Sequence, residues 1–600
     1  MQAAFTSSLE FFILSLIQLV KFTVTFKYSS NFLANGFIFV WFLFHEYQIN
    51  KNYLNISLTE QEAKQKAERF MSSRGWDISN HKYVAHFSQG SDNWGINMNL
   101  FAEKLAKKNK NEISKINRLS GAHRWDMRWF KELEKEEFYV SYTKDGQLTY
   151  FEHMVSDSLA GDSLSQDIAY DIAKIFLKNM PSNEFPCISD YVEDDWKIIE
   201  KKETRQPNRI DHYFKLEHAT YDFDETKIRM SVEIHGNEVI RYHRWLSQSE
   251  KLVTEVINFA YIKSFFENLN MSTLQIIVFI SMLIALFYFK IPANWSMAFK
   301  LALFLISVDV INNVLDMKLN MFWYDSMDTI ISHVMNGMIN SIMNASFIGF
   351  LIMVVITGME MLYRKTFPNF ISMRNLFHLK NFTNKTFFKN YLIGIVAGTC
   401  ILAISSMFYY ILDQSGNFIA YKWFDYDVLL TYNPLLTIIA NVISSSWMSI
   451  MVFALAFLII HQGTHSKWWT IFLSALIASI GPVMDTDPLI MGSIYFFIGG
   501  LISGYLLYNH GIIAFGSFII SSLLAQTWID VKINEWYKGF YDLLQKPTEN
   551  DISDFWEGIY IFLKLAIPYV IIYTITNYFT RLYAFRWREA MTFAYMPYWK

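Results

Sequence analysis

One carboxylate of this sequence stands inside a long apolar stretch. Asp309 occurs in the run LALFLISVDVINNV, which has the character of a membrane span. An ionisable side chain inside a bilayer is costly, and such residues commonly serve ion or proton transfer. Asp309 is therefore a candidate proton relay. A structural alternative places it near the external end of its span, paired with Asn312 or Asn313.

A second candidate set combines aromatic, amide and charged side chains near the C-terminal end. It comprises Asn534, Trp536, Tyr537, Phe540, Tyr541, Asp542 and Gln545, followed beyond one apolar stretch by Arg586, Trp587 and Arg588. An aromatic belt at a membrane surface would account for the Trp and Tyr residues individually. It does not account for amide and carboxyl groups at fixed spacing before the span and an Arg-Trp-Arg cluster after it.

These two separated blocks resemble the SbmA/BacA-like peptide transporters and the related membrane domains of ABC exporters. The resemblance covers residues 511–600. It implies inward transport of peptides, coupled to protons by family analogy, with the motif residues at the two ends of a span. It also implies a homodimer, or transporter helices supplied from elsewhere. Two joined genes, or a chain that continues past Lys600, would equally account for the partial coverage.

Motifs of catalysis are missing from the sequence: we find no P-loop, HExxH or nucleophile elbow. A second, weaker resemblance, carried by LDMKLNMFWYDSMDT, SIGPVMDTDP and GYLLYNHGII, links residues 56–520 to CPBP-family intramembrane proteases. Ser444 to Ser446 occupy the place of that family's acidic pair, and its histidine positions fall near Gly481 and Ile519. The alternative function is thus a catalytically inactive homologue that acts as a binding scaffold. We expect no enzymatic activity, metal or cofactor.

Composition places the chain in a membrane. Of its 600 residues, 52% are hydrophobic and the mean hydropathy is +0.17, which is high for a soluble protein of this length. With only Cys187 and Cys400, a disulfide framework is not expected. We expect membrane lipid, and a peptide substrate, as partners, and no nucleic acid.

Residues 50–265 differ from the rest because they are charged and lack a spanning stretch. Two similar units are predicted, each a helix followed by strands, and they resemble PepSY-like modules. Asp145-Gly146 in the first unit and Gly236-Asn237 in the second are hairpin signals between alternating runs.

The predicted fold is a polytopic α-helical membrane protein of about ten spans with an external α+β domain of two helix-plus-sheet repeats. Besides the N-terminal anchor, the candidate spans lie near 273–290, 297–315, 342–360, 391–411, 435–460, 469–482, 489–508, 511–528 and 556–579. The predicted domains are an N-terminal anchor (1–49), the α+β domain (50–265), a helical bundle (266–510) and the transporter segment (511–600). The loop from Arg364 to Lys389 carries six basic and no acidic residues, which places it in the cytoplasm. Counting spans outward from this loop puts residues 50–265 outside the cytoplasmic membrane of a bacterium.

Overall fold

We analysed a computed structural model of the full chain. It describes residues 58–88, 104–105, 116, 119–121, 123–180, 192–223, 225–247, 249–268, 283, 294–371, 373, 384–415, 419–420, 428, 430–480, 486–487 and 490–533. Residues 538–600 form a unit separate from the rest of the chain and lie outside the described residues.

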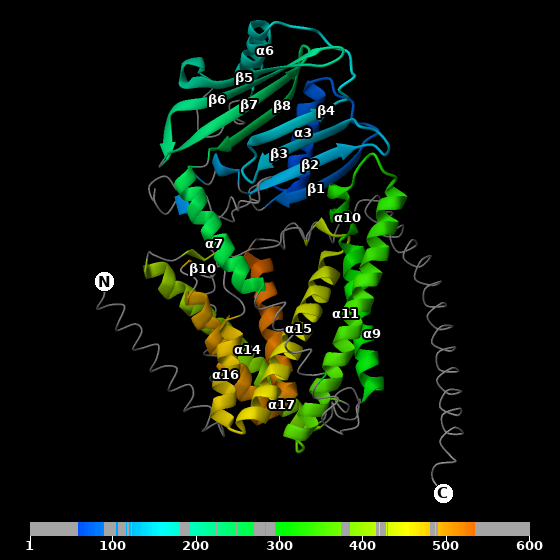
Figure 1. The fold of residues 1–600 in the computed structure, drawn as a ribbon, viewed down its shortest axis with the longest axis vertical. Helices are drawn as coiled ribbons and strands as arrows, with labels where there is room; N and C mark the ends of the chain where they lie inside the picture. The colour runs from blue at the N-terminus through cyan, green and yellow to red at the C-terminus, as the bar shows by residue number, and fades with distance from the viewer. Residues whose placement is uncertain are drawn as a thin grey trace, which may run out of the picture. The chain divides into compact units, whose positions relative to one another are not determined.

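The first part of the chain folds into an antiparallel α+β domain (Figure 1). Its first half consists of α3 (Glu60–Ser73), β1 (Lys82–Ser88), β2 (Arg124–Phe130), β3 (Glu137–Thr143) and β4 (Leu148–Met154). Its second half repeats this order with α6 (Gln166–Lys178), the short turn η3 (Glu193–Asp195), β5 (Trp196–Arg205), β6 (Ile210–Phe223), β7 (Thr226–His235) and β8 (Glu238–Leu246). Both predicted hairpins are confirmed, with Gly146 and Gly236 at positive φ in the turns.

The two halves are not separate sheets. Their strands form one eight-stranded sheet in the order β1-β2-β3-β4-β8-β7-β6-β5. At the centre, β4 pairs with β8 through Tyr150–His243, Phe151–Tyr242 and Glu152–Arg241. The helix-then-strands order of both units is present, but the units are joined edge to edge at this β4–β8 seam.

One hydrophobic core underlies both halves. Ala63 and Ala67 of α3 and Ala169 and Ala173 of α6 are fully buried in the same cluster, which includes the seam residue Phe151. These small side chains recur every fourth residue, so each helix turns one narrow face to the sheet. Alternation along the strands sends the remaining side chains to the face of the sheet opposite α3 and α6.

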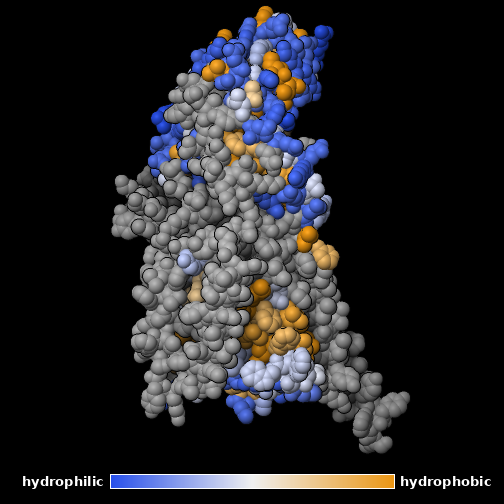
Figure 2. All heavy atoms as spheres, turned by 90° about the vertical axis from the view of Figure 1, so that its left-hand side faces the viewer, coloured by the Kyte–Doolittle hydropathy of each residue, from blue (hydrophilic) through white to orange (hydrophobic). Residues whose placement is uncertain are grey.

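The rest of the described chain is helical. The long helices are α7 (Glu250–Asn268), α9 (Trp295–Leu315), α11 (Ile330–Thr366), α14 (Lys385–Ser415), α15 (Pro434–Thr464), α16 (Lys467–Ile480) and α17 (Ile490–Ile533). The connection between α9 and α11 contains α10 (Met317–Asn320) and η5 (Met321–Trp323), and β9 (Ile419–Ala420) pairs with β10 (Thr486–Asp487). On the face in Figure 2, hydrophobic residues gather on the helices and hydrophilic ones on the sheet domain.

Within the described residues, five helices are long and apolar enough to cross a membrane: 295–315, 330–366, 385–408, 436–464 and 492–524. Ten spans are not shown. The predicted anchor at 1–49 and the span at 556–579 lie outside the described residues, as does the span at 273–290 except for Leu283. The span predicted at 469–482 is helix α16, whose 14 residues cover only about 21 Å, too short for a hydrocarbon core of about 30 Å.

Helix α17 reverses its direction at Gly511. Along α15, Phe457 lies against Gly504, and the ring of His461 is 5.6 Å from that of Tyr508. After Gly511 the chain runs back along α15 toward its N-terminal end, because Phe515 contacts Phe453 at 5.2 Å between ring centroids. The spans predicted at 489–508 and 511–528 are therefore the two antiparallel halves of this element.

The reversal requires glycine. Gly511 has φ of 78° and ψ of −172°, a conformation that side chains strongly disfavour. A Cβ there would also lie 2.6 Å from the hydroxyl oxygen of Tyr363 and 3.3 Å from the ring of Phe370. Elsewhere in α17, Gly500 and Gly504 contact α16, whereas Gly499 faces open space.

Replacing Gly511 with alanine should destabilise the helical bundle. We expect a loss of about 2–5 kcal/mol, because backbone strain of about 1–2 kcal/mol adds to steric overlap of about 1–3 kcal/mol. The measurement is thermal unfolding of purified protein in detergent. The matched control is Gly499→Ala, where a Cβ meets nothing within 4 Å; equal midpoints for the two variants would contradict the assigned reversal.

Candidate functional site

The predicted site residues fall in two classes. All ten residues of the C-terminal motif, Asn534, Trp536, Tyr537, Phe540, Tyr541, Asp542, Gln545, Arg586, Trp587 and Arg588, lie outside the described residues. Asp309 is described and is half-buried on α9, two turns before the helix ends.

The amides beside Asp309 are engaged elsewhere. Asn313 donates from Nδ2 to the main-chain oxygen of Asp309 at 2.9 Å, and Asn312 donates to Asn441 of α15 at 3.0 Å and to Asp316 at 3.3 Å. Among the described residues, no hydrogen bond reaches the Asp309 carboxylate. These two amides therefore do not donate to the carboxylate of Asp309.

The serines at the protease-like position lie in the middle of α15. Ser444 and Ser445 are both exposed, whereas Ser446 is only 1% exposed. Ile519 lies on the second half of α17, and Gly481 lies outside the described residues. The CPBP-like and PepSY-like resemblances stay predictions.

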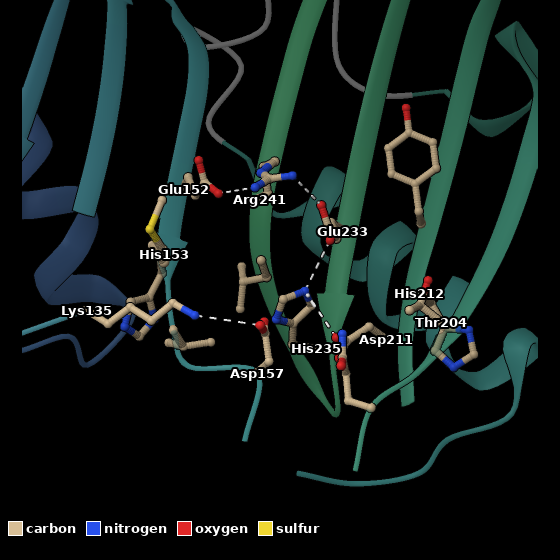
Figure 3. Close-up of a pocket in the computed structure, with 15 residues that line it drawn as sticks. Lys135, Glu152, His153, Asp157, Thr204, Asp211, His212, Glu233, His235 and Arg241 are labelled. Carbon is tan, nitrogen blue, oxygen red and sulfur yellow. Dashed lines mark hydrogen bonds and ion pairs between the residues drawn. The ribbon is translucent and has the colours of Figure 1, made fainter. Parts of the chain in front are cut away.

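A polar cavity opens on the face of the sheet opposite α3 and α6, where the two halves meet (Figure 3). Its volume is about 250 Å³, and its walls come from β4, β5, β6, β7 and β8 and from the segments beside them. The charged lining residues are Lys135, Glu152, Asp157, Asp211, Glu233 and Arg241, with His153, His212 and His235. Strand pairing brings these residues together from positions up to a hundred residues apart.

The seam is reinforced by a chain of ion pairs. Arg241 of β8 donates to Glu152 of β4 through Nη2 and to Glu233 of β7 through Nη1, the latter at 2.8 Å. Burial alone would raise the pKa of Glu233, but the hydrogen bond from His235 and the charge of Arg241 outweigh it and hold the pKa below the usual value. Arg241 thus links the two halves of the sheet by charge as well as by backbone pairing.

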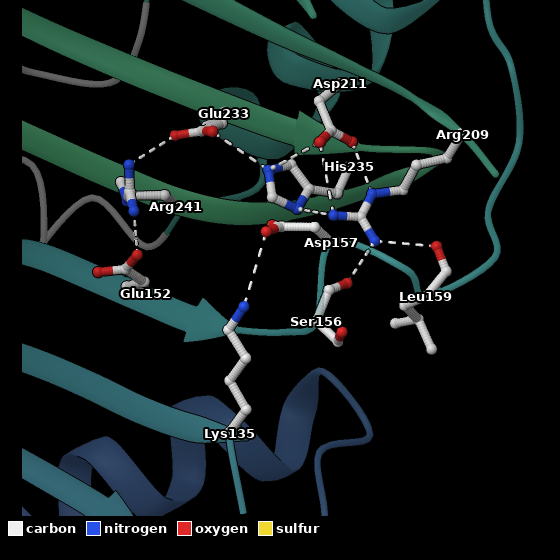
Figure 4. Close-up of polar contacts among 10 residues, drawn as sticks. All are labelled: Lys135, Glu152, Ser156, Asp157, Leu159, Arg209, Asp211, Glu233, His235 and Arg241. Atoms are coloured by element: carbon white, nitrogen blue, oxygen red, sulfur yellow. Dashed lines mark hydrogen bonds and ion pairs between the residues drawn. The ribbon is translucent and has the colours of Figure 1, made fainter. Parts of the chain in front are cut away.

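His235 continues this chain on β7 (Figure 4). Its Nε2 lies 3.1 Å from Glu233 and 3.6 Å from Asp211, and its Nδ1 lies 3.1 Å from Nη2 of Arg209. Since arginine can only donate, Nδ1 accepts a hydrogen bond from Arg209, and the hydrogen of a neutral imidazole is on Nε2. His235 therefore donates to Glu233 and transmits the network toward Arg209.

Arg209 ties the network to the segment that joins the two halves. It pairs with Asp211 at 2.7 Å, and both side chains are nearly fully buried, at 2% and 6% exposure. From Nη1 it donates to the main-chain oxygens of Ser156 at 2.9 Å and Leu159 at 3.0 Å. Such charge-assisted bonds from a planar fork fix geometry well. At the rim, Lys135 and Asp157 form a looser pair at 3.6 Å.

Carboxylates and cations alternate around the cavity, which suits a ligand that carries both donors and acceptors, such as a peptide. In the described part of the chain, no three His, Cys, Asp or Glu side chains are placed to hold a metal ion. The sequence analysis did not predict this site. The signal that could have indicated it is the placing of Glu233, His235 and Arg241 at alternate positions of β7 and β8, which puts them on one face of the sheet.

Comparison with known proteins supports the C-terminal resemblance. Residues 510–600 match the model of the SbmA/BacA-like family. No solved structure matches the chain. The matched segment begins at the reversal of α17, so its first element is the second half of that helix, which packs on α14 through Gly394 and Gly398.

Acidification should weaken the sheet domain through Glu233. Because its pKa is lowered from 4.5 in the folded state, its contribution to stability is complete above that value and is lost as the pH falls through the folded pKa. Glu233→Gln should lower the free energy of unfolding at neutral pH by about 1–3 kcal/mol and flatten the acid dependence. Urea unfolding at a series of pH values measures the free energy of unfolding and its acid dependence. The control is Glu200→Gln, because Glu200 is exposed and pairs with Lys215. The same pH dependence in wild type and Glu233→Gln would contradict this assignment.

Proposed function

We propose that this multi-pass membrane protein takes up peptides across the bacterial inner membrane, with the C-terminal segment as part of the transport path. The observation that carries the proposal is the family match at residues 510–600, next to helices long enough to span a bilayer. The matched segment starts on a helix that is packed into the bundle, which supports a role for the bundle in the same transporter.

The course of α11 supports an external sheet domain. Its first residue, Ile330, donates to Glu132 of the sheet domain at 2.9 Å. Its last turn carries Arg364 and Lys365, and α14 begins at Lys385. The basic residues Arg364 and Lys365 thus lie at the end of α11 away from its contact with the sheet domain, as expected if this end is cytoplasmic and the domain periplasmic.

Asp309 is the proposed coupling residue. Its carboxylate lies in an apolar helix and accepts no hydrogen bond from the described residues. A proton can therefore bind and leave without breaking a hydrogen bond within the described part of the chain. The cavity at the β4–β8 seam is proposed to receive the peptide on the external side, since its donors and acceptors match main-chain groups. The scaffold alternative has no observation in its favour.

Uptake of a toxic peptide into cells tests this function. Asp542→Asn should reduce uptake if the external motif forms part of the substrate path, and Asp309→Asn should reduce it by removing the titrating group. We expect a loss of at least about ten-fold, which corresponds to about 1.4 kcal/mol in the transport barrier. Membrane-fraction protein levels, measured alongside, control for insertion. Equal uptake by wild type and an empty vector would mean that the chain is not a transporter by itself.

Cysteine labelling of intact cells tests the topology. In a background of Cys187→Ser and Cys400→Ser, a membrane-impermeant reagent should label Asp145→Cys, in the β3–β4 turn, and not Lys380→Cys, in the basic loop. Labelling of both positions after the membrane is permeabilised is the control. The reverse pattern in intact cells would overturn the proposed orientation.

A further inference from the structure

The sheet domain and the bundle share a built contact at the β2–β3 turn. Arg128 of β2 is 3% exposed and binds Glu137 with two bonds, at 2.9 and 2.7 Å. Its Nη1 also donates to the main-chain oxygens of Phe322 at 2.9 Å and Tyr324 at 2.6 Å, in the α9–α11 connection. A buried arginine with all these bonds is costly to release, because each freed group would stay out of water.

Further groups of the same turn complete the contact. The carboxylate of Glu132 accepts the amide hydrogen of Ile330, one of the amides that the first turn of α11 leaves unpaired. Leu133, held at φ of 61°, donates its amide to the oxygen of Ser326 at 2.7 Å. Phe130 packs on Tyr324 with ring centroids 5.3 Å apart. The turn therefore holds the N-terminal end of α11 through main-chain groups, which are the groups least able to rearrange.

At its other end, α11 holds the reversal of α17. The hydroxyl oxygen of Tyr363, a residue 1% exposed, accepts the amide hydrogen of Ile512 at 3.1 Å and lies against Gly511. From Ile356 to Tyr363 every residue of α11 is buried, so this end is embedded in the bundle. Between the two contacts α11 is one helix of 37 residues, about 55 Å long.

We propose that α11 is a strut that couples the β2–β3 turn of the sheet domain to the reversal at Gly511, where the family-matched segment begins. Both ends are fixed by hydrogen bonds to its neighbours, and the helix between them is uninterrupted. A shift of the turn therefore displaces the start of the matched segment. This coupling does not depend on what the protein transports, and its test needs no substrate.

Hydrogen–deuterium exchange of the full chain in detergent tests the strut. Glu132→Ala and Arg128→Met should each raise amide exchange in the first turn of α11 and, at the far end, in residues 512–518, by about five-fold or more, the lower range of measured couplings. Glu134→Ala is the matched control: Glu134 lies in the same turn, 52% exposed, and pairs with Lys131 at 3.3 Å. It should leave both regions unchanged.

The reciprocal variant is Tyr363→Phe, which removes one acceptor and should raise exchange in the first turn of α11. If Arg128→Met also raises exchange in β3, the sheet domain itself has loosened and Glu132→Ala alone is decisive. The proposal is overturned if Glu132→Ala loosens the first turn of α11 and leaves residues 512–518 as in wild type. It is also overturned if Glu132→Ala changes neither region.

Discussion

Pairing of β4 with β8 is the interaction on which the sheet domain depends. Neither half could stand well alone, because an unpaired β4 or β8 would expose a row of main-chain donors and acceptors at a sheet edge. The pairing removes both edges and merges two small cores into one, from Ala63 in the first half to Ala173 in the second. It also sets Glu152 directly opposite Arg241, so the same register that closes the sheet creates the cavity's charge network.

The groups of that network are held from several elements of the sheet, which supports the proposed binding at the seam. Arg209 and Arg241 each bridge structural elements that are distant in sequence, and His235 joins them in one tautomer. Buried networks of this kind keep their geometry best when every group is paired, and here the Nε of Arg241 is buried without a hydrogen-bond partner among the described residues. The rim pair of Lys135 and Asp157 is looser and more exposed, at 50% and 69%, so it can yield to a ligand at little cost.

In the bundle, close packing around Gly511 has a comparable role. The positive φ of this residue lets α17 return along α15 and α14 within one turn, and Tyr363 fills the space that a side chain would need. Gly394 and Gly398 of α14 then allow the returning half to approach to backbone distance. The segment that matches the SbmA/BacA-like family thus enters the bundle through contacts that only glycine permits.

The sequence by itself determined the membrane class, the helix-then-hairpin order of both halves and the family of the C-terminal segment, because these follow from local patterns of hydropathy, turns and motif spacing. It did not predict β1 and β5, the two edge strands. Both faces of β5 are largely exposed, so its sequence is mostly charged and lacks the alternation of apolar and polar residues that indicates a strand. Only the tertiary structure decided that the halves form one sheet, that Glu152, Arg241 and Glu233 meet, and that Arg128 reaches the α9–α11 connection. Those contacts join residues from eight to nearly two hundred positions apart, and most of them depend on strand register and helix packing that no local pattern records.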